Sequence, residues 1–293
     1  MKNVNTILGV WLFLLIMTNT VRAENIRGIN MDFVNIGNAG NAADTQVMYD
    51  GTTGYGGVGY NYRIGKYEVT NAQWNAFVVK AGAPIGNPSE AYNTSAYYTG
   101  AQQPTNMVSW YEVAQFCNYL TSGNKSLGAY QLGTNGSITV NRAAAISAYS
   151  TVYVIPTEDE WYKAAYFKPD GSGYSIWANG TNTSPPWWQA NFSSSSPWNV
   201  GAGAQEQNGT YDMMGNVWEW TDTFFGSYPV FRGGAFSGSS SYLASVTRRY
   251  FYDPSAEEID LGFRVASIPE PATLLLLGLG GMVLRAKNGK RKA

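Results

Sequence analysis

Residues 211–220 read Tyr-Asp-Met-Met-Gly-Asn-Val-Trp-Glu-Trp, and this stretch carries the most specific structural pattern in the chain. Trp218 and Trp220 flank Glu219 in it. Side chains alternate between the two faces of a strand, so both indoles are expected on one face and the carboxylate on the other. Large aromatic side chains mostly fill cores. The stretch therefore predicts a buried strand with a carboxylate on its opposite side.

A carboxylate at this depth needs a partner, because a charge is tolerated inside a protein only when it is paired. Two arginines lie further along the chain, Arg232 before a Gly-Gly pair and Arg264 in the segment Gly262-Phe263-Arg264. We expect both guanidinium groups to be buried, as partners of Glu68 or Glu219. This structural role is favoured over substrate binding.

Outward from this stretch, the sequence predicts a few short helices and many short strands. Three helices are expected after the N-caps Thr70, Ser109 and Thr157, the second with a capping box to Glu112. The third begins with three carboxylates, which the helix dipole favours there. Residues 168–210 have few periodic apolar positions and predict a long loop region. Strands are expected within 31–34, 60–69, 217–220, 231–236 and 262–266. The pattern is that of an α+β domain.

Five segments in chain order resemble the domain of the formylglycine-generating enzyme, or sulfatase-modifying factor. They are Ile64 to Asn71, Pro104 to Trp110, Ile155 to Trp161, Tyr211 to Trp220, and Phe231-Arg232-Gly233-Gly234 with Gly262-Phe263-Arg264. The resemblance implies a single domain with a variant C-type-lectin-like fold, short elements and much irregular loop. Members include copper-dependent cysteine oxidases, iron-dependent sulfoxide synthases and binding proteins without catalysis. We assign the domain to residues 60–267, with 24–59 as its N-terminal extension.

The composition excludes several kinds of site. The chain of 293 residues has no His and one Cys, so His-ligated zinc or iron, disulfides and thiolate clusters within the chain are excluded. Residues 24–268 hold 12 Lys and Arg against 19 Asp and Glu, a net charge of −7. An acidic body without a basic stripe argues against nucleic acid as a partner.

The sequence departs from the oxidases at their metal. By the resemblance, two cysteines before the final Gly-Phe-Arg hold copper, and their places here fall near Ser241 and Val246. Neither side chain supplies the thiolate that Cu(I) requires. Cys117 lies on an expected helix, where a free cysteine is usually a small buried hydrophobe. No copper and no iron are therefore expected.

Calcium is the metal that the resemblance still implies. One structural calcium site of the family matches Asp212, Gly215, Val217 and Glu219, and a second matches Asn191 and Phe192. Carboxylate, amide and carbonyl oxygens form the ligand set that a hard cation prefers. In the alternative, Asp212 caps a turn and Glu219 pairs with an arginine.

The two ends resemble export signals. Residues 1–23 have the charged start, apolar run and small-residue cleavage site of a signal peptide, and an uncleaved anchor is the alternative. Residues 268–293 begin Ile-Pro-Glu-Pro, continue as an apolar helix over 272–284 and end in a basic tail. This end resembles the PEP-CTERM signal, which exosortase removes in Gram-negative bacteria. The short helix predicts transient membrane association, and an ordinary membrane helix is the alternative.

Three functions remain open. The first is a non-catalytic module on the bacterial cell surface, or released from it, that binds extracellular polysaccharide or a surface protein. It would use exposed aromatic clusters such as Trp187-Trp188, Trp198 and 250–252. The second is an enzyme with altered chemistry near Tyr250, Tyr252, Asp253 or Glu257. The third is a formylglycine-generating oxidase. No nucleophile and base can be named for either enzyme.

Overall fold

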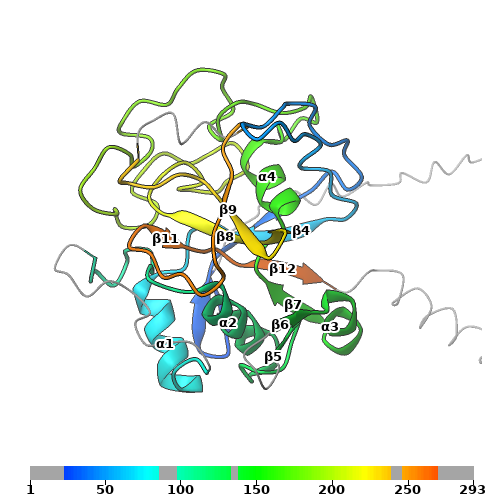
Figure 1. Cartoon of the computed structure of the whole chain (residues 1–293), viewed down its shortest axis with the longest axis vertical. Helices are drawn as coiled ribbons and strands as arrows, with labels where there is room; N and C mark the ends of the chain where they lie inside the picture. The colour runs from blue at the N-terminus through cyan, green and yellow to red at the C-terminus, as the bar shows by residue number, and fades with distance from the viewer. Residues whose placement is uncertain (1–22, 86–97, 133–137, 239–245, 270–293) are drawn as a thin grey trace, which may run out of the picture.

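The computed structural model describes residues 23–85, 98–132, 138–238 and 246–269 (Figure 1). Almost all of the predicted signal peptide and most of the sorting segment lie outside these residues. Within the part of the chain that the structure describes, no helix is long and apolar enough to cross a membrane.

The domain is α+β with a C-type-lectin-like arrangement of short elements, as the sequence predicts. Most strands belong to two four-stranded sheets, ordered β3-β4-β12-β7 and β10-β9-β8-β11, and two hairpins complete the set. All neighbours are antiparallel except β8 and β11. The strands are β1 (Glu24–Ile26), β2 (Ile29–Met31), β3 (Phe33–Ile36), β4 (Tyr62–Gly65), β5 (Tyr130–Leu132), β6 (Ile138–Val140), β7 (Thr151–Val154), β8 (Trp218–Phe225), β9 (Tyr228–Arg232), β10 (Tyr250–Phe251), β11 (Leu261–Gly262) and β12 (Ala266–Pro269).

The three predicted helices are present and begin at the predicted caps. They are α1 (Asn71–Ala81), α2 (Trp110–Ser122) and α4 (Glu158–Tyr166). At each start the cap hydroxyl accepts a backbone N–H three residues on, and the residue at that position reaches back to the cap. A fourth helix, α3 (Arg142–Ala148), the hairpin β5–β6 and the strands β1, β7 and β10 have no counterpart among the predicted elements.

Several predicted strands differ in their bounds. The one expected within 31–34 is divided at Asp32 between β2 and β3, and the one within 60–69 covers only Tyr62–Gly65. The strand expected at 231–236 starts at Tyr228 and ends at Arg232, because Gly233 and Gly234 have φ of 105° and 82°, outside the strand region. The strand expected at 262–266 is interrupted, with β11 before the gap and β12 after it. The predicted loop region 168–210 contains neither a helix nor a strand.

The core has two clusters of buried side chains. One joins α1 and α2 through the stacked rings of Trp74 and Phe116, which Phe263 meets edge-on, and it includes Trp220. The other surrounds α4 through Trp161. In Figure 1 the strands β4, β8, β11 and β12 cross the middle of the molecule, with α4 above and α1 and α2 below. This arrangement places residues 211–220 between the two clusters.

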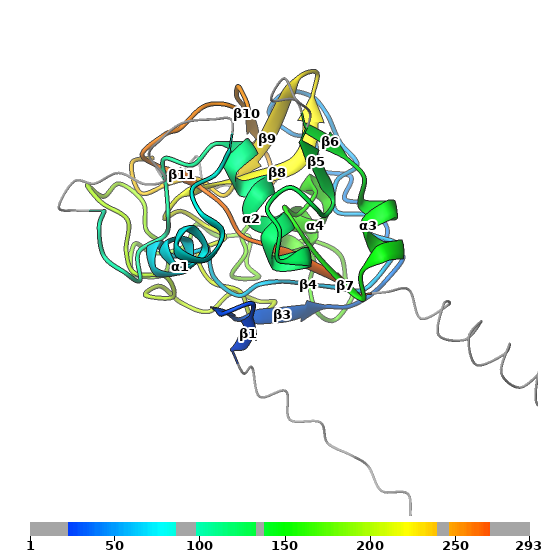
Figure 2. The same cartoon turned by 90° about the horizontal axis from the view of Figure 1, so that it is seen from below.

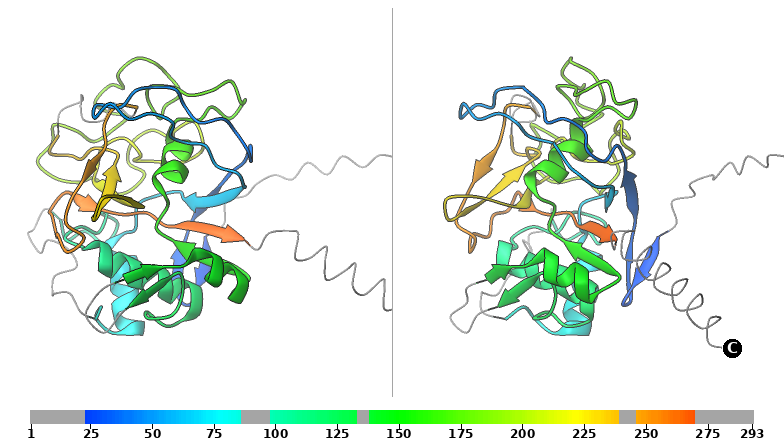
Figure 3. Two further views of the ribbon diagram at one scale, coloured as in Figure 1. Left: turned by 45° about the vertical axis from the view of Figure 1, so that its right-hand side comes forward. Right: turned by 90° about the vertical axis from the view of Figure 1, so that its right-hand side faces the viewer.

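The ends of the described chain lie on one side of the molecule. In Figure 2, β1 is at the bottom while β9 and β10 are at the top. Figure 3 agrees, with β1 and the end of β12 on the side opposite to β9 and β10. The free end of the β8–β9 hairpin therefore points away from the segment that leads to the sorting signal.

Candidate functional site

The predicted alternation around Glu219 is confirmed. Trp218 and Trp220 both pack edge-on against Phe231 of the neighbouring strand, with ring centroids 5.4 and 5.6 Å away. Glu219 on the opposite side is fully buried and pairs with Arg264, as expected. Arg264 donates from Nε at 2.6 Å and from Nη2 at 2.5 Å, and Trp161 Nε1 donates at 2.6 Å. Glu219 is thus held by a two-pronged ion pair and an indole.

Other buried acids surround the same arginine. Glu68, Glu206 and Asp212 are all buried. Glu68 accepts hydrogen bonds from the Asn216 amide at 2.7 Å and the Val217 N–H at 3.1 Å. Burial raises the pKa of Glu68 well above its usual range, that of Glu206 to about 8 and that of Asp212 to about 6. The region is rich in carboxyl groups that one guanidinium does not balance.

The residues of the predicted calcium sites lie close together. Asp212 has a left-handed φ of 62°, and its Oδ2 accepts from the Gly201 N–H at 2.7 Å. Gly215, with φ of 88°, packs so tightly on Asn191 that a Cβ would lie 2.2 Å from the Asn191 carbonyl oxygen. Asn191 also accepts from the Asn216 N–H through that carbonyl. The two predicted ligand sets are therefore neighbours.

Free acceptors at this place can be counted. Asn191 Oδ1 is buried and accepts no hydrogen bond in the described structure. Glu219 uses three of about four lone-pair positions, two on Oε2 and one on Oε1. Among the described residues, no three His, Cys, Asp or Glu side chains are grouped to hold a metal. The residues fit a cation only if amide and carbonyl oxygens supply most of its ligands, as the predicted sets do.

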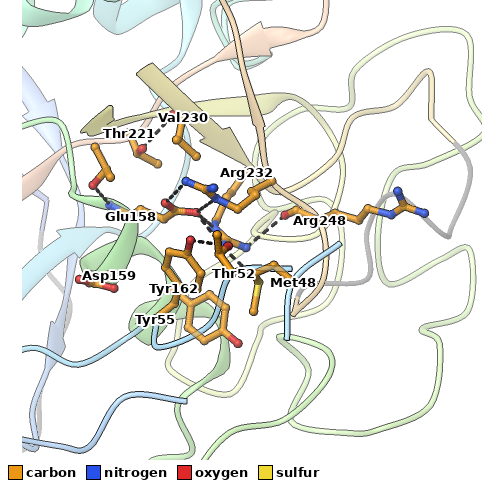
Figure 4. A network of polar contacts seen from close by, with 12 residues as sticks. Met48, Thr52, Tyr55, Glu158, Asp159, Tyr162, Thr221, Val230, Arg232 and Arg248 are labelled. Atoms are coloured by element: carbon orange, nitrogen blue, oxygen red, sulfur yellow. Dashed lines mark hydrogen bonds and ion pairs between the residues drawn. The ribbon is translucent and has the colours of Figure 1, made fainter. Parts of the chain in front are cut away.

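A second buried ionic network, around Glu158, was not predicted. Arg232 and Arg249 both donate to Glu158, with Nε···Oε1 distances of 2.7 and 2.8 Å (Figure 4). The prediction that Arg232 pairs with Glu68 or Glu219 is wrong. Its guanidinium pairs instead with Glu158, at the start of α4. Arg249 also donates to Asp50 at 2.6 Å, and the Tyr55 ring lies 5.2 Å from both guanidinium carbons.

This network joins distant segments. Arg232 Nη1 donates to the Arg248 carbonyl at 3.1 Å, so β9 holds the chain just before β10. The acidic triplet at 158–160 is a local signal of this network, although the helix dipole alone also favours carboxylates there. Its other terminal acid, Glu160, instead pairs with Arg142 at 3.0 Å.

The places of the copper cysteines offer no thiolate. Val246 is buried, and Ser241 lies outside the described residues. Cys117 is fully buried within α2, as predicted, and desolvation raises the pKa of its thiol well above the usual value. A buried neutral thiol in an apolar core is chemically inert.

The predicted aromatic clusters differ in exposure. Trp187 and Trp188 project from the long loop, 73% and 53% exposed, whereas Trp198 is half-buried. In the 250–252 cluster, Phe251 and Tyr252 are exposed and Tyr250 is half-buried against Trp218. Asp253 lies on the surface beside them, and Glu257 is half-buried.

The fold agrees with the class that the sequence resembles, the sulfatase-modifying factor domains. Residues 56–268 match the model of the sulfatase-modifying factor enzyme 1-like domain, and the chain belongs to that family. Residues 267–292 match the PEP-CTERM protein-sorting motif. That motif implies processing by exosortase, export and sorting to the cell surface.

Relatives cover different shares of the chain. The chaperone protein LppX of Paenibacillus barcinonensis is 25% identical over 238 residues, 70% of this chain and 79% of its own length. The inactive C-alpha-formylglycine-generating enzyme 2 of Mus musculus is 35% identical over 136 residues, 39% of this chain and 42% of its own. The match therefore spans less than half of the mouse protein.

Solved structures share the fold. Treponema denticola variable protein 1 superposes with a TM-score of 0.60 at 24% identity, covering 85% of this chain and 99% of that one. PvdO from Pseudomonas aeruginosa gives a TM-score of 0.59 at 17% identity, covering 81% and 94%. At these identities the likeness concerns the fold alone.

Proposed function

We propose that this protein is a non-catalytic binding or structural module that is exported to the bacterial cell surface. The single observation that carries the proposal is that its one cysteine, Cys117 on α2, is fully buried in the hydrophobic core. Oxidation of a substrate cysteine by the family mechanism needs a pair of thiolates at a metal, and this chain has one thiol. A retained fold does not by itself retain the chemistry.

The relatives support this direction. The mouse relative is itself named an inactive formylglycine-generating enzyme, and the Paenibacillus relative is named a chaperone. Non-catalytic roles are therefore represented among proteins of similar sequence. An enzyme of the family is the alternative, either a formylglycine-generating oxidase or one with altered chemistry, and the following experiment tests the oxidase.

Purified protein is expected to bind no stoichiometric copper and to leave the cysteine of a sulfatase-type peptide unoxidised. The reason is the absence of a second thiol anywhere in the chain. Copper is measured by metal analysis after dialysis, and the peptide by mass spectrometry. A formylglycine-generating enzyme with both cysteines is the positive control, and Cys117→Ala should match the wild type. Copper-dependent formylglycine in the peptide would overturn the assignment.

We propose further that calcium binds the region of Asp212, Gly215, Val217 and Glu219, with Asn191 and Phe192 next to it. The supporting observations are the excess of buried carboxyl groups around Arg264 and the unpartnered Asn191 Oδ1. A divalent cation there would offset the excess charge and occupy that amide oxygen. Its role would be structural, because it would join the loop before β8 to the segment at Asn191.

In a host with exosortase, the mature protein is expected to lack the sequence after the Pro269-Glu270-Pro271 region and to reach the cell surface or the medium. The apolar stretch over 272–284 is too short for a comfortable bilayer span, which suits a transient sorting helix. Mass spectrometry of the mature C-terminus measures the outcome, with an exosortase-deficient host as control. A surface product that still carries Lys292 would indicate an ordinary membrane anchor.

A further inference from the structure

Aromatic side chains gather at the free end of the β8–β9 hairpin. Gly226, with φ of 64°, and Ser227 make the turn that sets Phe225 opposite Tyr228. β10 then adds Phe251, opposite Val230 of β9. We define the aromatic platform as the exposed side chains at this end other than Phe224, which points to the opposite face of β8: Phe225, Tyr228, Phe251 and Tyr252.

The platform is open to solvent although its rings pack together. Its members are between 40% and 49% exposed. The Phe225 and Phe251 rings are 4.7 Å apart and inclined by 29°, and the Tyr228 and Phe251 rings are 6.3 Å apart and inclined by 22°. Contiguous exposed apolar surface of this kind usually marks an interaction site.

Buried groups hold the platform in place from below. The Arg249 guanidinium lies 5.7 Å from the Phe225 ring centroid. On the opposite face of β8, Phe224 packs edge-on against the buried Trp110 at 5.1 Å and holds the end of the hairpin. Arg249 is itself fixed by Glu158 and Asp50. The rings are therefore anchored to the ionic network around Glu158, so that binding a ligand costs little ordering of the site.

The position of the platform indicates where its ligand comes from. β9 and β10 lie on the side opposite to the end of β12, from which the sorting segment continues (Figures 2 and 3). While that segment is held in the membrane, the platform faces outward. Its occupant is therefore expected in the extracellular space.

The charge around the platform narrows the chemistry of the ligand. The two arginines beneath the platform, Arg232 and Arg249, are balanced by two carboxylates, those of Glu158 and Asp50. Next to Tyr252 stands the exposed Asp253, and its hydrogen bonds from Ser255 lower the pKa of its carboxyl group. With a net charge of −7 over residues 24–268, an acidic polymer would be repelled. The net negative charge therefore disfavours an acidic polymer, and the uncharged aromatic rings of the platform suit a neutral one.

We propose that the aromatic platform binds a neutral polysaccharide. The rings of Phe225 and Tyr228 stack on Phe251, and the apolar C–H faces of sugar rings would pack on the ring surface that this stack leaves exposed. The Tyr228 and Tyr252 hydroxyls would supply the polar edge that sugar hydroxyls need. This inference rests on the proposed function, because it names the ligand and surface of a non-catalytic module.

The test is native affinity electrophoresis of the exported, processed protein. Gels contain hydroxyethylcellulose, galactomannan or dextran as neutral probes, or alginate as an acidic one. We expect wild-type protein to be retarded by at least one neutral probe and not by alginate. The variant Phe225→Ala/Phe251→Ala should lose at least about tenfold in affinity. Val79→Ala/Leu127→Ala, which removes two exposed apolar side chains from α1 and from the loop after α2, is the control and should keep the wild-type affinity.

Any one of the following results would overturn the proposal. It is overturned if no neutral probe retards the wild type, if alginate alone does, or if the platform variant binds as well as the wild type. A dimer in size-exclusion chromatography that the platform variant abolishes would assign the surface to a second copy of the chain. Since both substituted side chains are exposed, the variant should melt within a few degrees of the wild type. Tyr228→Ala/Tyr252→Ala tests the same surface independently.

Failure here is distinguishable from failure of the proposed function. If the protein binds no polysaccharide, the absence of copper-dependent oxidation would still support a non-catalytic module. Conversely, formylglycine formation would refute the non-catalytic assignment whatever the gels show.

Discussion

Replacing Arg264 by methionine is expected to lower the free energy of unfolding by about 3–5 kcal/mol. Glu219 is fully buried and receives two of its three hydrogen bonds from Arg264. Without the guanidinium, its carboxylate would stay in the core beside the buried Glu68 and Asp212. Two backbone carbonyls, of Gly65 and Tyr211, would lose their Arg264 donors as well.

Equilibrium urea unfolding followed by tryptophan fluorescence measures this loss. The control is Arg63→Met, which removes a partly exposed ion pair to Glu24 and should cost no more than about 1 kcal/mol. Adding Glu219→Gln to Arg264→Met should restore part of the stability, because the buried charge is then absent. A loss for Arg264→Met no greater than that for Arg63→Met would show that the pair contributes little.

The sequence predicted the elements whose signals are local. Thr70, Ser109 and Thr157 start helices because each places a hydroxyl three residues before a side chain that completes the cap. Local signals were also available for two missed elements: Asn141 caps the alanine-rich α3, and β7 is rich in β-branched residues. The glycine pair at 233–234 was likewise a readable end for β9.

The missed part of the site depends on contacts between distant residues. Arg232 and Glu158 are 74 positions apart, and Arg249 and Asp50 are 199 apart. The local sequence around each arginine does not indicate which carboxylate it pairs with in the folded protein. Arg264 and Glu219 were predicted as one of several pairings, and only the fold selected among them. The platform was predicted in part, through residues 250–252, because its other members come from a hairpin whose turn was not recognised.

Glu219 was given two alternative roles, as a calcium ligand or as the partner of an arginine. The ion pair with Arg264 is present, yet one lone-pair position on Oε1 remains. The two roles are therefore compatible at one carboxylate. Measurements with and without calcium distinguish a Glu219 that binds the ion as well as Arg264 from one that pairs with Arg264 alone.

Chelation is expected to lower the melting temperature, and millimolar calcium to restore it. An ion that binds only the folded state stabilises it by about 2.7 kcal/mol at a hundredfold excess over the dissociation constant. For a domain of this size that corresponds to about 5–10 °C. Differential scanning calorimetry in EDTA and in calcium gives the shift directly.

Variants separate the ion from the ion pair. Glu219→Gln should abolish most of the calcium response, but it also weakens the contact with Arg264. Asp212→Asn is the sharper variant, because Asp212 forms no ion pair in the described structure and asparagine tolerates its φ of 62°. It removes one negative charge from the site, so half-maximal stabilisation should need more calcium. The exposed Asp170→Asn should respond as the wild type does. Equal melting temperatures in EDTA and calcium for all four proteins would leave Glu219 solely as the partner of Arg264, since its buried charge is then balanced by the guanidinium alone.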